Sequence, residues 1–501
     1  MPLKTNTMNN YLSIDIGTTC CKCQLFDENG DILKYISKEY SFKEIQGDNY
    51  IDIVKIKDNV LSMIYEVSKE YKISSICISS LGESFVLLDE NDDIVFYPML
   101  YTDPRGNKEA KEFISLLGEE YIFNVTGLIP QAMFSLCKLM YIKNNYPDSY
   151  KKGNKAFQVC DYIGYVLTGE RVIDYSLASR TCGFDIKKLQ YDEKIFDSLN
   201  IDSDIFSKPM PTGTIVGNIK DDIKKLLNID YDIKLVLGSQ DQVLNAVGSF
   251  CLKPGDATDG IGTVECITPV FDFKSDDIQM AKEGYPIVPF LNTGMYCTYI
   301  CNYASNSITN WFKNELAHKY KDNKDDFFDY IEDKMNDSID DIYCLPYFAG
   351  SCIPYQDLNA KGAFIGLTTF TSDAQLYKAI IESLAMEMRF EVENGNKFGI
   401  KVSKLIATGG GSLSKKRLQL KADIENVKVE TLVSQEGGLC GGAIIQAVAL
   451  GQFNNYEDAC KCFVKIKDTY IPSYDKHIKY EDKYNKYLKM YKNIKNIFEG
   501  E

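Results

Sequence analysis

Apolar and polar residues alternate along residues 11–16, and this period of two predicts a β-strand. Gly17-Thr18-Thr19 then predicts a tight turn, and residues 23–26 a returning strand. Asn29-Gly30 is a hairpin signal, and a third strand is predicted at residues 32–36. The chain is therefore expected to begin with three antiparallel strands.

The pattern changes to a helical period at residues 53–71, where apolar residues recur every three or four positions. Short apolar runs at residues 73–80 and 85–88 predict buried strands. Residues 234–237 predict a further strand, and residues 240–250 a helix. This alternation of helices and strands predicts α/β layers rather than an all-helical or all-β fold.

Two short stretches about half a chain apart resemble each other. Ile16-Gly17-Thr18 recurs as Ile261-Gly262-Thr263, with Asp15 or Asp259 just upstream. Each reads as a strand, a Gly-Thr turn and a returning strand. The echo indicates two similar halves around a cleft; chance is the alternative, because a three-residue match is common.

Length, composition and charge narrow the classes of protein. The chain has 501 residues, which predicts two to four domains. A hydrophobic content of 45% with 25% charged residues excludes a fully disordered chain. The net charge of −15 argues against a general nucleic-acid binder. No apolar run is long enough to span a bilayer, so we expect no membrane partner and a cytoplasmic protein.

The 16 cysteines are then expected to be reduced and structural. The spacing of Cys20-Cys21-Lys22-Cys23 is not that of a metal site. Only two histidines occur, His318 and His477, which nearly excludes a histidine-ligated metal or a Ser-His-Asp triad. Proton transfer is therefore expected to fall to a carboxylate.

Four glycine-rich segments are candidates for phosphate binding through exposed backbone N–H groups. They are Gly17-Thr18-Thr19, residues 260–263, residues 407–412 and residues 436–442. The third lies between a predicted strand and a predicted helix, a junction that lets a nucleotide approach the backbone. Each could also be a simple turn, but four in one chain favour a nucleotide. Asp241, at another strand–helix junction, is either a catalytic base or a helix N-cap.

These segments resemble the FGGY family of carbohydrate kinases over nearly the whole chain. Residues 362–367 followed by residues 375–382 fit the family's C-terminal signature. Residues 133–142 fit the N-terminal signature, except that Tyr141 stands where Trp is usual. Gly82-Glu83 departs from the Met-His of xylulose kinases and from the Arg-Glu of glycerol kinases, so neither substrate follows from this motif.

The resemblance implies two ribonuclease-H-like (actin-like) α/β domains flanking a deep catalytic cleft, at residues 9–247 and 248–501. It implies transfer of the γ-phosphoryl group of Mg-ATP to a hydroxyl of a sugar or polyol, first of all a ketopentose such as xylulose. Asp241 would be the base, and Asp15 and Asp241 would hold Mg²⁺. Substrate hydroxyls would be bound by Glu83, Asp103, Asp241 and Gln242. ATP would lie against Gly17, Thr18, Thr19, Lys22, Gly262, Thr263, Gly409, Gly410, Gly411 and Ser414.

Several alternatives stay open at this point. The substrate could be a deoxyketose, gluconate or another polyol, because one pocket hydrogen bond can alter preference strongly. A catalytically inactive sugar-binding regulator would keep the same motifs. Glu83 could be a solvated loop acid rather than a substrate ligand. The resemblance also leaves open a homodimer.

Overall fold

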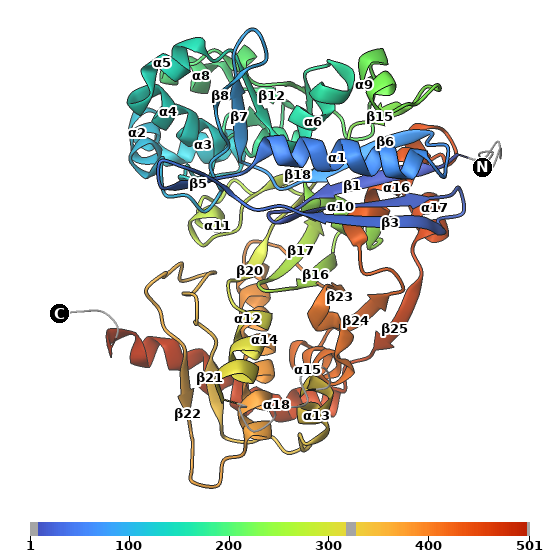
Figure 1. The fold of residues 1–501 in the computed structure, drawn as a ribbon. Helices are drawn as coiled ribbons and strands as arrows, with labels where there is room; N and C mark the ends of the chain where they lie inside the picture. Colours follow the sequence, from blue (N-terminus) through green and yellow to red (C-terminus); the bar gives the residue numbers. More distant parts are fainter. Residues whose placement is uncertain (1–8, 317–326, 498–501) are drawn as a thin grey trace.

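Two large β-sheets organise the computed structural model, which describes residues 9–316 and 327–497 (Figure 1). The first sheet has the order β14-β15-β6-β1-β2-β3. Its strands are β1 (Tyr11–Ile16), β2 (Cys20–Phe26), β3 (Ile32–Glu39), β6 (Ser75–Ser80), β14 (Ile215–Asn218) and β15 (Lys234–Val236). β1, β6 and β15 run parallel, so their carboxyl ends meet at one edge.

The second sheet follows the order β18-β19-β17-β16-β23-β24-β25, with β20 also paired to β17. Its strands are β16 (Asp256–Ile261), β17 (Glu265–Phe271), β18 (Val288–Phe290), β19 (Met295–Cys297), β20 (Ile300–Asn302), β23 (Lys404–Thr408), β24 (Lys428–Leu432) and β25 (Ile466–Tyr470). β16, β23 and β24 run parallel.

The internal echo in the sequence corresponds to a repeated structural unit. β1 and β2 form an antiparallel hairpin whose first strand pairs in parallel with β6. β16 and β17 form the same hairpin, and β16 pairs in parallel with β23. Both Gly-Thr turns therefore lie at the carboxyl edge of a sheet, where α/β proteins bind ligands.

Smaller sheets and helices surround the two large sheets. The short strands are β4 (Lys43–Ile45), β5 (Asp48–Tyr50), β7 (Phe85–Leu88), β8 (Ile94–Phe96), β9 (Lys155–Gln158), β10 (Val172–Asp174), β11 (Phe184–Asp185), β12 (Gln190–Tyr191), β13 (Lys208–Met210), β21 (Tyr343–Leu345) and β22 (Ala363–Ile365). The helices are α1 (Ile53–Ser68), α2 (Asn107–Leu117), α3 (Glu119–Thr126), α4 (Ser135–Asn145), α5 (Pro147–Lys152), α6 (Val159–Thr168), α7 (Tyr175–Ser179), α8 (Glu193–Leu199), α9 (Asp221–Leu226), α10 (Asp241–Gly248), α11 (Gln279–Lys282), α12 (Asn306–Trp311), α13 (Phe327–Asp333), α14 (Asp373–Asn396), α15 (Lys415–Glu425), α16 (Gly437–Ala449), α17 (Tyr456–Phe463) and α18 (Tyr474–Ile494).

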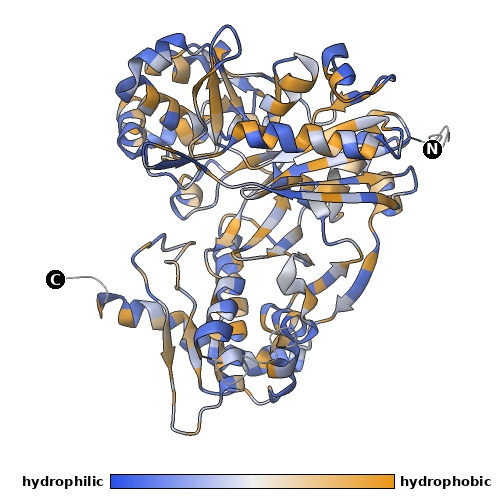
Figure 2. Cartoon of the chain, viewed as in Figure 1, coloured by the Kyte–Doolittle hydropathy of each residue, from blue (hydrophilic) through white to orange (hydrophobic). Residues whose placement is uncertain are grey.

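Helix α1 shows how the local pattern produces the structure. Asp52 caps its first turn by accepting a hydrogen bond from the Lys55 N–H at 3.0 Å. The apolar positions that predicted the helix are its buried face, and hydrophilic and hydrophobic positions alternate along it in Figure 2. The helix packs that face on β2 and β3.

The glycine-rich segment 436–442 is mostly helix rather than a phosphate-binding turn. It forms the start of α16, which packs on α10, β1 and β6 of the first sheet although it follows β24 of the second (Figure 1). A Cβ atom on Gly441 would lie 2.0 Å from the Leu244 carbonyl oxygen, and one on Gly442 would lie 2.1 Å from Ser13 Oγ. These glycines therefore permit close helix packing, which overrides their low helix propensity.

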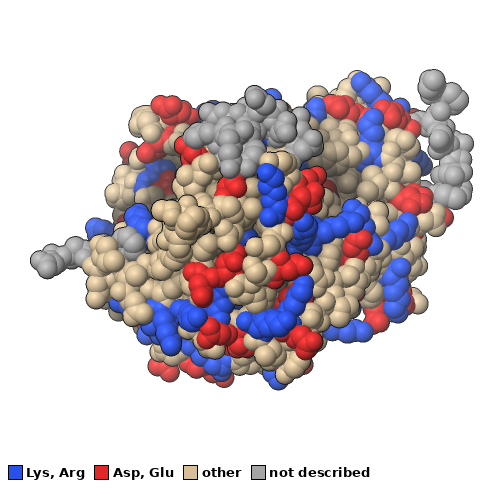
Figure 3. All heavy atoms as spheres, turned by 90° about the horizontal axis from the view of Figure 1, so that it is seen from below, with Lys and Arg blue, Asp and Glu red and all other residues tan. Residues whose placement is uncertain are grey.

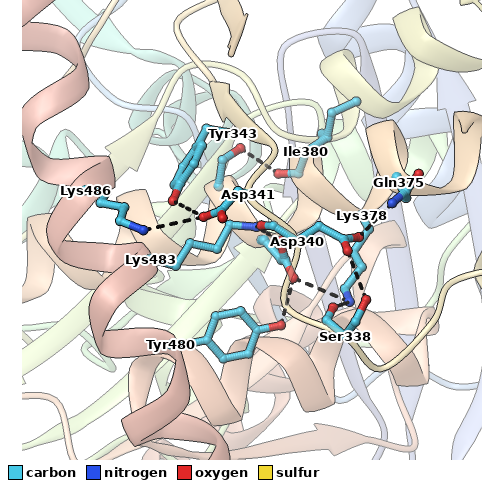
Figure 4. Close-up of polar contacts among 12 residues, drawn as sticks. Ser338, Asp340, Asp341, Tyr343, Gln375, Lys378, Ile380, Tyr480, Lys483 and Lys486 are labelled. Atoms are coloured by element: carbon cyan, nitrogen blue, oxygen red, sulfur yellow. Dashed lines mark hydrogen bonds and ion pairs between the residues drawn. The ribbon is translucent and has the colours of Figure 1, made fainter. Parts of the chain in front are cut away.

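The carboxyl-terminal helix α18 is fastened by a buried polar network (Figure 4). Lys483 Nζ donates to Glu382 Oε2 at 2.5 Å and to the Asp340 carbonyl oxygen at 2.7 Å. The Tyr480 hydroxyl donates to Glu382 Oε1 at 2.7 Å. Lys378 reaches the same loop through the Asn336 carbonyl oxygen, at 2.8 Å. The network ties α18 to α14 and to the loop before β21.

The surface charges, the helices and the cysteines complete the description of the fold. Acidic and basic side chains are interspersed on the face drawn in Figure 3. None of the described helices combines the length and the apolarity needed to cross a bilayer. All 16 cysteines are free thiols.

Candidate active site

The carboxyl edge of the first sheet carries two acidic side chains. Asp15 is on β1, and its Oδ1 accepts a hydrogen bond from the Ser79 hydroxyl of β6 at 2.6 Å. Asp241 is the first residue of α10, which begins after the four residues that follow β15, and its Oδ1 accepts from the Gln242 N–H at 2.7 Å. The parallel strands thus bring together two carboxylates that are far apart in the sequence.

Both carboxyl groups hold protons more tightly than usual. Burial raises the pKa of Asp241 to about 7, and the Asp15 and Glu83 carboxylates act in the same direction, while Arg180 opposes them. Burial also raises the pKa of Asp15, against the Ser79 hydrogen bond and the charge of Lys22, and Glu436 adds to the rise. The shared cause is negative charge gathered in a poorly solvated place.

This gathering of negative charge suits a divalent cation. Mg²⁺ is usually held by one or two carboxylates, with water and phosphate oxygens completing its shell. Space exists beside the pair, because a Cβ atom on Gly438 would come no nearer than 4.0 Å to Asp15 Oδ1 and to the Asp241 carbonyl oxygen. Residues 9–316 and 327–497 contain no group of three or more potential ligands from His, Cys, Asp and Glu. The two carboxylates alone fit a cation that also binds phosphate.

The first hairpin turn lies next to this pair. The Gly17 N–H donates to the Cys20 carbonyl oxygen at 3.0 Å, and the Thr19 side chain is exposed. Lys22 pairs with Asp15 in the strand register, and its Nζ contacts Glu436 Oε1 at 2.9 Å. A hollow of about 600 Å³ opens beside Thr19 and Lys22.

The second hairpin turn is held by the start of helix α12. The Gly262 N–H donates to the Val264 carbonyl oxygen at 2.9 Å, and the Thr263 carbonyl oxygen accepts from the Ser305 N–H at 3.0 Å. Asn306 Nδ2 donates to the Ile261 carbonyl oxygen at 3.2 Å. The start of α12 therefore holds this turn in place.

The turn at residues 409–411 approaches the second hairpin closely. A Cβ on Gly409, which has φ +79°, would lie 2.8 Å from the Ile261 carbonyl oxygen. A Cβ on Gly411 would lie 2.2 Å from a methyl group of the same isoleucine, whereas one on Gly410 would meet only Asn306 Nδ2, at 3.7 Å. Gly409 and Gly411 are thus needed for packing, and Gly410 leaves open space.

Ser414 caps α15 and makes an additional contact. Its Oγ accepts from the Arg417 N–H at 3.1 Å and donates to Glu332 Oε1 at 2.7 Å. The predicted adenosine residue is therefore tied to α13.

Glu83 follows β6 at the carboxyl edge of the first sheet. It is only 5% exposed, so the reading as a solvated loop acid is wrong. Its Oε1 accepts from Arg180 Nε at 2.5 Å. The preceding turn lies beside α10, because a Cβ on Gly82 would be 3.5 Å from Gln240 Nε2, and Ser80 forms a β-bridge with Gln240.

The two other predicted substrate residues make protein contacts. Asp103 accepts from Arg105 Nε at 2.9 and 3.0 Å and from its Nη2 at 2.5 Å. Burial acts to raise the pKa of Asp103, but Arg105 outweighs it and holds that pKa below its usual value. Gln242 Oε1 accepts from the Thr268 hydroxyl at 3.3 Å, which joins α10 to β17.

Sequence reasoning missed three residues that the structure places at these sites. Arg180 pairs with Glu83, Glu436 pairs with Lys22, and Asn306 holds the second hairpin. Two of them had a signal: Arg180 lies in residues 174–181, which resemble a segment that many sugar kinases place near the substrate, and Glu436 begins the glycine-rich segment 436–442. Of the histidines, His477 lies on α18 beside the Ile424 carbonyl oxygen, and His318 lies outside the described residues.

Comparison with protein families gives the identification. Residues 10–248 match the model of the N-terminal domain of the FGGY family of carbohydrate kinases, and residues 287–450 match that of its C-terminal domain. The chain belongs to the FGGY family of carbohydrate kinases. It is a phosphotransferase that acts on an alcohol group, and ATP is the co-substrate of such kinases.

Individual relatives of this FGGY kinase carry different substrate names. It is 26% identical to a xylulose kinase of Lactococcus lactis over 98% of both chains, and 27% identical to a gluconokinase of Bacillus subtilis over 90% of both. The solved xylulose kinase and gluconate kinase of Lactobacillus acidophilus each superpose with a TM-score of 0.89 at 25% identity. These two matches cover 98% and 97% of this chain and 99% and 98% of the solved chains. The predicted actin-like fold is confirmed, whereas the division at residues 247 and 248 stays a prediction.

Proposed function

We propose that this kinase phosphorylates a neutral ketose, first of all a ketopentose such as xylulose, with Asp241 as the general base. The observation that carries the proposal is the position of Asp241, at the carboxyl edge of the first sheet beside both Asp15 and the Glu83 turn. The name of the Lactococcus lactis relative supports the ketopentose.

Asp241 has the chemistry that a base needs here. Its carboxylate accepts the proton of the substrate hydroxyl as the hydroxyl oxygen attacks the γ-phosphorus and the bond to the β-phosphate oxygen breaks. A base works best when its pKa lies near the working pH, and burial raises the pKa of Asp241 to about 7. Phosphoryl transfer then depends mainly on holding the reactants in line.

ATP is proposed to lie between the two sheets, against both hairpin turns. The residues that would hold its phosphates and adenosine are Gly17, Thr18, Thr19, Lys22, Gly262, Thr263, Gly409, Gly410, Gly411 and Ser414. The repeated hairpins support this assignment, because each presents a turn at a carboxyl edge. Asp15 and Asp241 would hold Mg²⁺, which offsets the charge of the phosphates.

The sugar pocket is proposed to recognise hydroxyl donors through Glu83, Asp103, Asp241 and Gln242. Carboxylates accept hydrogen bonds and suit neutral O–H groups. Arg180 is paired with Glu83, and Arg105 is paired with Asp103. An aldonate would place its carboxylate among these acids, and the arginines beside Glu83 and Asp103 are already paired with them, so this arrangement favours a ketose over gluconate.

The test is ADP release with a panel of about 50 sugars, polyols and aldonates, alongside thermal shift, because a bound ligand raises apparent stability. We expect turnover with neutral ketoses. Asp241→Asn should lower turnover by roughly 10²- to 10⁴-fold while nucleotide binding survives, the usual worth of a general base. Binding of a sugar without turnover would favour a regulator, and wild-type turnover in the variant would remove Asp241 as the base.

A further inference from the structure

The turn that carries Glu83 is held in an unusual conformation. Glu83 has φ +66°, in the left-handed region that few residues other than glycine adopt. Such conformations persist where surrounding contacts over-determine them, and they cluster at functional sites. The contacts that hold this turn therefore matter for its role.

Two elements distant in the sequence hold the turn. The Ser135 hydroxyl at the start of α4 donates to the Glu83 carbonyl oxygen at 2.7 Å. The same helix start binds the residues after α7, because the Leu136 N–H donates to the Thr181 carbonyl oxygen at 3.1 Å. The N-terminal signature segment thus joins the Glu83 turn to Arg180.

Arg180 contacts a single oxygen of the Glu83 carboxylate. Its Nε and Nη2 both contact Oε1, each at 2.5 Å. Arg180 is 3% exposed, and its guanidinium lies over the rings of Phe134 at 4.9 Å and Tyr299 at 5.7 Å. A cation held between rings and a carboxylate has one orientation, so the carboxylate has one orientation too.

The other carboxylate oxygen of Glu83 is not bound by Arg180. Oε2 has no hydrogen-bond partner among residues 9–316 and 327–497. It is also not among the buried side-chain atoms there that lack a partner, so it is not sealed off from solvent. The second cation near this carboxylate, Lys138, is fully buried and donates to the Asp103 carbonyl oxygen at 3.3 Å. Oε2 therefore stays available to a ligand, and the turn that carries it lies beside Gln240, the residue before Asp241.

We propose that Arg180 is a positioning residue of the sugar pocket: it fixes Oε1 of Glu83 so that Oε2 accepts a hydrogen bond from a substrate hydroxyl. This rests on the proposed sugar kinase function. Arg180 does not touch the reacting atoms; it acts through Glu83. Its loss would leave the carboxylate free to rotate and the acceptor out of place.

The experiment compares Arg180→Met and Arg180→Lys with Arg389→Met. Arg389 is a matched control, since it is 8% exposed, pairs with Glu393 at 2.7 Å and Glu481 at 2.6 Å, and lies 3.9 Å from the Tyr484 ring. Steady-state kinetics are measured for the best neutral sugar of the panel and for ATP, with melting temperatures for each variant.

Arg180→Met should lower kcat/KM for the sugar by roughly 10- to 100-fold, the range for a charged hydrogen bond, while KM for ATP changes less than about twofold. Arg180→Lys should recover part of the loss, because lysine keeps the positive charge but lacks the planar guanidinium that donates from two nitrogens at once. Arg389→Met should lower the melting temperature only. Equal effects on sugar and ATP, or an unchanged sugar kcat/KM in Arg180→Met, would overturn the proposal.

A double-variant cycle separates positioning from folding. In a Glu83→Gln background, Arg180→Met leaves no buried charge unpaired, and it should change sugar kcat/KM by less than about twofold, since partners in one interaction are not additive. Additive losses would overturn the proposal. If the wild type binds sugars without turnover, the kinase function fails, and calorimetry of the same variants tests Arg180. If it neither turns over nor binds any sugar, both fail.

Discussion

The crossing of α10 and α16 determines where Asp241 lies. The closeness of this packing can be tested by a glycine-to-alanine substitution, which adds one methyl group. A Cβ on Gly441 would lie 2.0 Å from the Leu244 carbonyl oxygen and 3.1 Å from the Gly248 nitrogen. Neither backbone atom can rotate away, so the helices must separate by about 1.4 Å to reach an ordinary contact of 3.4 Å. Overpacking of this kind costs about 1–3 kcal/mol.

Helix propensity alone predicts that Gly441→Ala stabilises the protein. Alanine is favoured over glycine within a helix by about 0.5–1 kcal/mol. Gly438 lies on the same helix, and a Cβ there meets nothing nearer than 4.0 Å. We therefore expect Gly441→Ala to destabilise the protein and Gly438→Ala to leave it as stable as the wild type, or more so.

The assay is urea denaturation and thermal melting of both variants, with Gly217→Ala as the control. Gly217 is on the edge strand β14, and a Cβ there has no atom within 4 Å. Gly441→Ala should also lose turnover, because displacing Asp241 by about 1 Å can cost on the order of 10²-fold. A Gly441→Ala protein as stable as Gly438→Ala would refute the packing argument.

Two further predictions address the nucleotide and the pH dependence of stability. Gly410→Val should fold normally, since the nearest atom to its Cβ is Asn306 Nδ2 at 3.7 Å, but should weaken ATP binding while sugar binding persists; unchanged ATP affinity by calorimetry would place the nucleotide elsewhere. Burial raises the pKa of Asp161 to about 8, so the folded state keeps a proton that the unfolded chain loses near pH ~4, and stability should fall as pH rises between these values. Asp161→Asn should flatten that part of the melting-temperature profile, and an unchanged slope would contradict the assignment.

Local pattern determined much of this protein. The alternation in residues 11–16, the Asn29-Gly30 turn and the apolar face of α1 each correspond to an element of the structure. These signals work because strand and helix periods, turn chemistry and caps act over a few residues. The Gly-Thr echo also predicted the repeated hairpins, since each hairpin is local.

The sequence alone could not determine which groups meet across the fold. The contacts of Glu83 with Arg180 and of Lys22 with Glu436 join residues separated by 97 and 414 positions. Segment 436–442 has the composition of a turn, yet its glycines form a helix because only small residues fit against α10 and β1. Long-range packing decides such cases, because burial and close approach outweigh the small local preferences of the chain.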